Sequence, residues 1–87
     1  MNQAIQFPDL QHWDEEQRAV VFPAQQAGAL IECIISAQGL AELAKTEVQN
    51  AQHALALFSE LRFELEERAE AGIEDEEFNS QGQIELG

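Results

Sequence analysis

The chain has 87 residues, and its 17 acidic side chains against four basic ones give it a net charge of −13. This length predicts one domain over residues 1–87 with a single hydrophobic core, and it disfavours a large, deeply enclosed substrate pocket. Nucleic acids and anionic membranes are not expected as partners, because binding them requires clustered Lys and Arg side chains.

The first element predicted along the chain is a short strand over residues 3–7. Polar and apolar residues alternate there and place Ile5 and Phe7 on one face. A polar loop is expected from residue 9 to residue 17, with Trp13 as its only large aromatic side chain.

A hairpin is predicted next, because two runs rich in β-forming residues, 18–23 and 29–35, are separated by a short Gly-containing stretch. In the second run Ile31, Cys33 and Ile35 share one face that is entirely apolar. We expect this face to point into the core.

Two helices are predicted after the hairpin. Ser36 is a suitable N-cap for a short helix over residues 37–44. Thr46 and Gln49 form a capping-box pattern, and the apolar residues that follow step by three or four positions, which predicts one long amphipathic helix over residues 47–72.

A last strand is predicted over residues 83–86, with Ile84 and Leu86 facing inward; the alternative is a disordered tail. The order strand, hairpin, two helices, strand is typical of an α+β fold. We expect a small antiparallel sheet whose apolar face is covered by the long helix.

One combination of segments is distinctive: Met1–Asp9, Trp13–Glu15, Phe22–Ala24, Gly28 and Ile31–Ser36. It resembles a family of short bacterial proteins known as domain of unknown function 1488, and the resemblance extends more loosely to the end of the chain. It implies an intracellular, stand-alone α+β domain, and it brings no catalytic or ligand-binding residues with it.

The candidate binding residues are His12, Trp13 and Asp14 in the predicted loop, because this short segment combines an imidazole, an indole and a carboxylate. Trp13 has a competing and more common role as a cover over the open end of a small core. His12 and Asp14 could act as an acid/base pair, but no third group is evident beside them.

The remaining chemistry-bearing residues favour structural roles. Cys33 lies in the apolar strand face and is expected to be a core residue with an unreactive thiol. His53 has no second metal ligand at helical spacing, and residues 77–82 only partly match a calcium loop. No catalytic residue, metal site or cofactor is predicted.

A single cysteine allows no internal disulfide, which is typical of a reducing compartment, and no apolar run approaches the roughly 20 residues that span a bilayer. We therefore expect a cytoplasmic protein.

The main functional hypothesis is a protein-binding or regulatory module without catalytic activity, presenting an acidic helix face or a strand edge to another protein. The alternatives are a structural homo-oligomer, an enzyme that uses residues 12–15, and an acidic surface that mimics nucleic acid.

Overall fold

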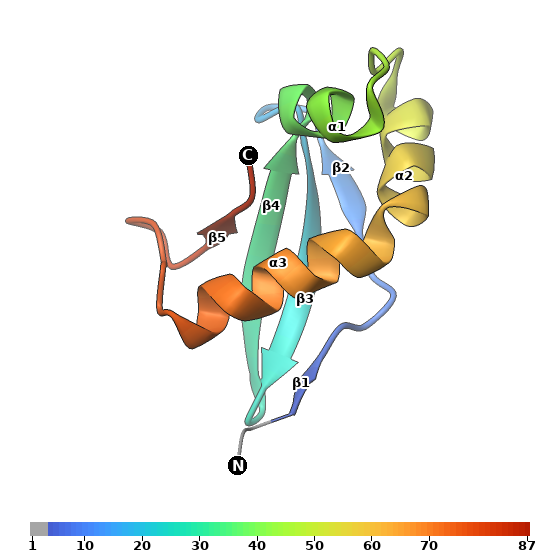
Figure 1. Ribbon diagram of the computed structural model, residues 1–87. Helices are drawn as coiled ribbons and strands as arrows, with labels where there is room; N and C mark the ends of the chain where they lie inside the picture. Colours follow the sequence, from blue (N-terminus) through green and yellow to red (C-terminus); the bar gives the residue numbers. More distant parts are fainter. Residues whose placement is uncertain (1–3) are drawn as a thin grey trace.

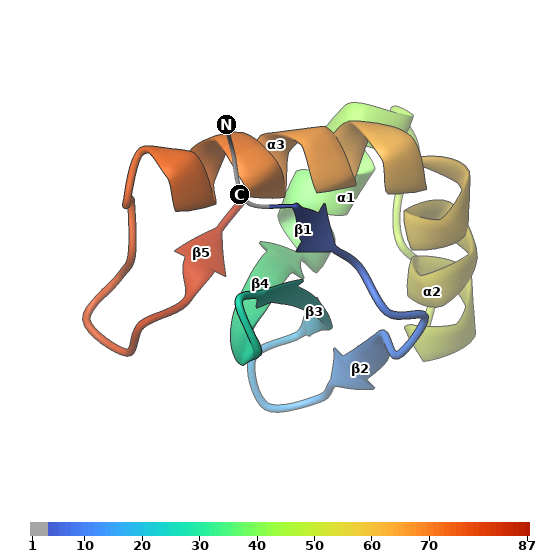
Figure 2. The ribbon, with the colours of Figure 1, turned by 90° about the horizontal axis from the view of Figure 1, so that it is seen from below.

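The computed structural model describes residues 4–87 and has an α+β fold with a five-stranded mixed sheet and three helices (Figure 1). This confirms the predicted fold class. Residue 3, where the first strand was expected to begin, lies outside the described residues. Helix α3 crosses one face of the sheet, and no helix of the described chain covers the opposite face (Figure 2).

The centre of the sheet is a hairpin of two eight-residue strands, β3 (Ala19–Gln26) and β4 (Ala29–Ser36). Ala27 and Gly28 connect them, both with positive φ (53° and 83°), as a tight two-residue hairpin turn requires. Strand β3 therefore continues three residues beyond its predicted end at residue 23.

The sequence predicts that this strand ends at Pro23, because proline cannot donate a ladder hydrogen bond. In the structure, two short strands share one edge of β3. Strand β1 (Ile5–Gln6) pairs with Gln25 and Gln26, and β2 (His12–Asp14) pairs with residues 19–21. Pro23 lies opposite the gap between these strands, where its missing N–H costs no pairing.

Two details of the predicted sheet were wrong. The loop expected over residues 9–17 contains β2, which is held by its antiparallel pairing with β3. The last strand, β5 (Ile84–Glu85), is present where a strand was predicted, but it runs parallel to Cys33 and Ile34 of β4, so the sheet is mixed rather than antiparallel.

The short helix is confirmed as α1 (Ala37–Ala44), and the Ser36 hydroxyl oxygen accepts a hydrogen bond from the backbone N–H of Gly39 (3.0 Å). The long helix is divided into α2 (Ala51–Glu60) and α3 (Arg62–Glu74), which run in different directions (Figure 1). Asn50 rather than Thr46 caps α2: its Oδ1 accepts from the N–H of His53 at 2.8 Å.

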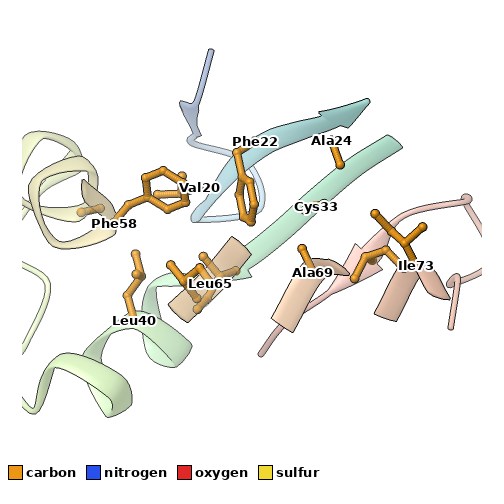
Figure 3. Packing of buried hydrophobic residues seen from close by; sticks show 12 residues of the cluster. Val20, Phe22, Ala24, Cys33, Leu40, Phe58, Leu65, Ala69 and Ile73 are labelled. Carbon is orange, nitrogen blue, oxygen red and sulfur yellow. The ribbon is translucent and has the colours of Figure 1, made fainter. Parts of the chain in front are cut away.

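The hydrophobic core fills the space between the sheet and the helices (Figure 3). Phe22 of β3 meets Phe58 of α2 with ring centroids 4.8 Å apart, and both side chains are almost completely buried. Cys33 and Ile35 lie in this core, as their strand face predicted, and Ile31 is partly buried against it.

The C-terminal segment is part of this packing rather than a loose tail. Ile84 is buried, and its Cγ2 lies 3.0 Å from the point where a Cβ on Gly72 would stand. The backbone N–H of Ser36 donates to the carbonyl oxygen of Gly87 (2.7 Å), and Gly39 gives α1 the clearance to approach Gly87. Gly39 and Gly72 thus let two helices pack closely on the last residues.

None of the helices in residues 4–87 is both long enough and apolar enough to cross a membrane.

Candidate functional site

The face of the sheet that no helix covers, here called the outer face, has its own small apolar cluster. Strand alternation places the side chains of Ala19, Val21 and Ile34 on the side opposite the core. They are nevertheless only 2%, 4% and 7% exposed. The same alternation assigns these strand positions to the outer face: Gln6, His12, Asp14, Ala19, Val21, Pro23, Gln25, Leu30, Glu32, Ile34, Ser36 and Glu85.

A pocket of about 260 Å³ opens at one end of this face. Its buried apolar lining comes from β3 and β4, and polar groups surround it. The lining residues are Gln17, Ala19, Ile34, Ser36, Glu85 and Gly87. We call this site the outer pocket.

The three candidate residues of the sequence lie on β2, but they do not converge. Strand alternation places His12 and Asp14 on the outer face and Trp13 on the core side. Trp13 packs against the main core, its indole Nε1 donates to Oε1 of Glu15 (2.7 Å), and the Arg18 guanidinium lies 5.6 Å from its ring centroid. Trp13 thus covers the edge of the core.

Asp14 contributes to the outer pocket indirectly, by fixing Gln17. The side-chain Nε2 of Gln17 donates to Oδ2 of Asp14 (3.0 Å), and the Gln17 backbone N–H donates to Oδ1 (3.2 Å). These hydrogen bonds lower the pKa of the Asp14 carboxyl, because they favour its charged form. With its amide nitrogen oriented in this way, Gln17 presents an Oε1 oxygen that accepts no hydrogen bond from residues 4–87.

Of the described residues that line the outer pocket, Glu85 alone has an ionisable side chain. Its Oε2 accepts from Nδ2 of Asn79 (3.0 Å), while Oε1 has no partner among residues 4–87. Oδ1 of Asn79 also accepts the backbone N–H groups of Gln81 and Gln83, both at 2.9 Å. The segment that partly matched a calcium loop is therefore an Asn79-centred turn that positions Glu85.

The charged strand residues on the outer face are all acidic. The five strands contain three acidic residues, Asp14, Glu32 and Glu85, and all three lie on this face. The strands contain no Lys or Arg. The nearest cation in sequence, Arg18, pairs with Glu15 at 3.6 Å.

The matches to known proteins cover nearly the whole chain. The model of a "Protein of unknown function (DUF1488)" family matches residues 5–86. The chain belongs to the DUF1488 family. It is 41% identical to the uncharacterized protein YrdB of Escherichia coli K12 and 40% identical to that of Shigella flexneri, each over 86 residues and 99% of both chains.

A crystal structure shows the same fold in another DUF1488 protein. This protein of unknown function, from Shewanella loihica PV-4, is 43% identical and superposes with a TM-score of 0.95 over 99% of this chain and 94% of that one. The resemblance seen in the sequence is thereby confirmed.

The other reactive side chains of this DUF1488 chain lie apart from the outer face. Cys33 points into the core, and burial raises the pKa of its thiol to about 12, so it stays protonated and unreactive. His53 helps to organise the start of α2, where its Nδ1 accepts from the backbone N–H of Gln49 (3.0 Å). Within residues 4–87, no three His, Cys, Asp or Glu side chains are grouped to hold a metal ion.

Sequence reasoning missed the parts of the DUF1488 chain that make the outer pocket: Gln17, Ser36, Glu85 and the apolar lining. The signal was present in the second face of the hairpin, where Val21 and Ile34 are apolar although the core lies on the other side. That signal could not point to the pocket by itself, because the pocket also needs β5 beside β4.

Proposed function

We propose that this protein is a non-catalytic binding module whose outer face receives a basic segment of a partner protein. The observation that carries the proposal is that one sheet face without helices combines apolar side chains that reach solvent, Leu30 and Pro23, with carboxylates of a single sign. An apolar surface bordered by charge is typical of a protein-interaction site.

The chemistry of the face selects the kind of partner. Leu30, which is 67% exposed, and the half-buried Pro23 offer apolar contacts to the aliphatic residues of an extended segment. The buried cluster of Ala19, Val21 and Ile34 supports the strands that carry them. Asp14 and Glu32 on the same face favour Lys and Arg at the alternate positions. The net charge of −13 adds long-range attraction for a basic partner and increases the association rate.

The absence of a catalytic role is part of the same proposal. Its support is the separation of the reactive side chains: His12 lies on the outer face, whereas Cys33 lies in the core with its pKa raised. A histidine and a thiol on opposite faces of one sheet cannot act as a nucleophile and its base, since that pair needs hydrogen-bond contact.

The test is binding of a short synthetic peptide that alternates lysine and valine, followed by two-dimensional NMR of the full chain. We expect saturable shifts of the amide signals of Val21 and Ile34, and weaker binding at higher salt. Glu32→Lys should weaken the affinity about tenfold, whereas Glu67→Lys, an equal charge change on an exposed part of α3, should have a smaller effect.

Two results would contradict the proposal. One is equal binding of a matched peptide that alternates glutamate and valine. The other is a footprint of shifted signals on α3 instead of the outer face.

A second candidate, association of two copies, is favoured by the open edge of β4. Strand β5 pairs only with Cys33 and Ile34 of β4, so residues 29–32 have no strand on that side within the described chain. Leu30 in this stretch is 67% exposed. An unpaired edge with an exposed apolar residue is a template for strand pairing.

Sedimentation velocity tests this second candidate. Because the charge of each copy opposes pairing, we expect dimers only at high micromolar concentration and more of them at high salt. Leu30→Lys should abolish the dimer. A monomer under all these conditions would eliminate the candidate.

A further inference from the structure

We infer that the outer pocket binds a primary ammonium group carried on an unbranched aliphatic chain, as in a lysine side chain or an alkyl polyamine. This inference rests on the proposed function in one respect only, since a lysine of the basic partner is one of the two sources of the group. The pocket is a separate site at the end of the outer face and stands on its own geometry.

Two side-chain oxygens of the pocket, Oε1 of Gln17 and Oε1 of Glu85, accept no hydrogen bond from residues 4–87. The Asp14 carboxylate holds the amide nitrogen of Gln17 and so leaves the Oε1 of Gln17 available. Among residues 4–87, Oε1 of Glu85 has no hydrogen-bond partner, while Oε2 accepts from Asn79. Ser36 supplies a hydroxyl oxygen that already accepts from Gly39.

These acceptors match the donors of an ammonium group, which has three N–H bonds and no lone pair. An anionic ligand is disfavoured, because the ionisable side chain that residues 4–87 contribute to the lining, Glu85, is a carboxylate and would repel an anion. Metal ions are disfavoured too, since no group of three acidic, histidine or cysteine ligands is assembled within residues 4–87.

The apolar part of the pocket accounts for the aliphatic chain. Ala19 and Ile34 line it with buried side chains. A pocket of about 260 Å³ has room for about eight atoms the size of a water molecule, taking about 30 Å³ for each. The four-carbon stem and nitrogen of lysine fit within that space, with the stem against Ile34 and the ammonium toward Glu85.

The test is an NMR titration of the full chain with three small probes. Nα-acetyl-lysine N-methylamide represents a lysine of a protein, 1,5-diaminopentane represents a free polyamine, and the Nε-acetylated form of the first probe lacks the charge. We expect the two ammonium probes to shift the amide signals of Ala19, Ile34 and Glu85 in a saturable way. The acetylated probe should leave these signals in place.

Two variants test the role of the carboxylate. Glu85→Gln should weaken binding of the ammonium probes about tenfold, because it removes the charge and keeps the shape. Glu67→Gln changes the net charge equally at an exposed position of α3 and should leave the affinity unchanged. Equal affinity in Glu85→Gln and the unchanged chain would overturn the inference, as would equal binding of the acetylated probe.

The outcomes separate this inference from the proposed function. Tight binding of 1,5-diaminopentane with weak binding of the lysine probe would identify a free amine as the ligand of the pocket. The basic segment of a partner would then bind only the remainder of the outer face. Binding of the lysine–valine peptide that is unaffected by Glu85→Gln would support the proposed function and overturn the pocket. Saturable binding of the ammonium probes without binding of the lysine–valine peptide would support the pocket and overturn the proposed function.

Discussion

Replacing Phe58 with alanine is expected to lower the free energy of unfolding by about 3–5 kcal/mol. The Phe58 side chain is fully buried in α2, and its ring packs on Phe22 of the central hairpin at 4.8 Å between centroids. Removing it leaves a cavity at the contact between the second helix and the sheet, and it also removes the aromatic pair.

Phe63→Ala is the matched control for this prediction, because Phe63 is the same residue type five positions along the chain and is 84% exposed. Its effect should stay within about 0.5 kcal/mol. Urea denaturation followed by circular dichroism and by the fluorescence of Trp13 measures both variants. Phe58→Leu, which fills part of the cavity, gives an intermediate value if the alanine variant does not fold. Similar losses of unfolding free energy for Phe58→Ala and Phe63→Ala would refute the burial of Phe58 against Phe22.

Stability is expected to fall steeply between about pH 9 and pH 12 because of one thiol, Cys33. Burial raises the pKa of Cys33 from 9.0 to about 12 in the folded chain. The unfolded chain therefore loses this proton first, and ionisation favours unfolding. The contribution is fully present below pH 9 and declines by about 1.4 kcal/mol for each pH unit above it, which amounts to about 4 kcal/mol at pH 12.

The composition of the chain makes this prediction easy to isolate. There is no tyrosine and one lysine, so few other side chains titrate in the same range. The measurement is the free energy of unfolding in urea at a series of alkaline pH values. Cys33→Ala should be less stable at neutral pH because of its smaller side chain, yet it should have a much flatter pH dependence. The same slope in Cys33→Ala and the unchanged chain would assign the alkaline loss to other groups.

The sequence predicted those elements whose signal is local. Ser36 caps α1 as its position before residues 37–44 indicated, and Cys33 and Ile35 alternate into the core as a strand requires. The hairpin was recognised because both strands are rich in β-forming residues and are joined by a short loop. In each case the residues that decide the structure are neighbours along the chain.

The break between α2 and α3 shows where periodicity fails as a guide. Phe58, Leu61 and Leu65 keep the spacing of a continuous apolar stripe, and all three contact the core although the backbone departs from helical geometry at Leu61. The start of α3 contacts a segment far away in the sequence: Arg62 donates to Gln11 at 2.9 Å and pairs with Asp9 at 3.3 Å. Contacts between residues about 50 positions apart produce no periodic pattern in the sequence, so they could not be predicted from it.

The candidate site was predicted only in part for the same reason. His12 and Asp14 were selected as loop residues, and they lie on a strand beside the outer face. Gln17, Ser36 and Glu85 come from three separate segments, and they meet only because β5 adds to β4 in parallel and the Asn79 turn directs Glu85. A parallel partner joined through three helices cannot be assigned from alternation alone.

The unequal strand lengths divide the molecule into parts of different local stability. Strands β1 and β2 have two and three residues, so each can separate from β3 by giving up very few hydrogen bonds. The equally short β5 is held more firmly, because Ile84 is buried and the N–H of Leu86 also donates to Ile34. The β3–β4 hairpin has eight paired positions and should open only with the whole domain, so its central amides should be the slowest to exchange with solvent. Val21 and Ile34 face each other within this hairpin. The apolar floor of the outer face thus stays ordered while the edges open and close, and a ligand would meet a surface that needs little rearrangement.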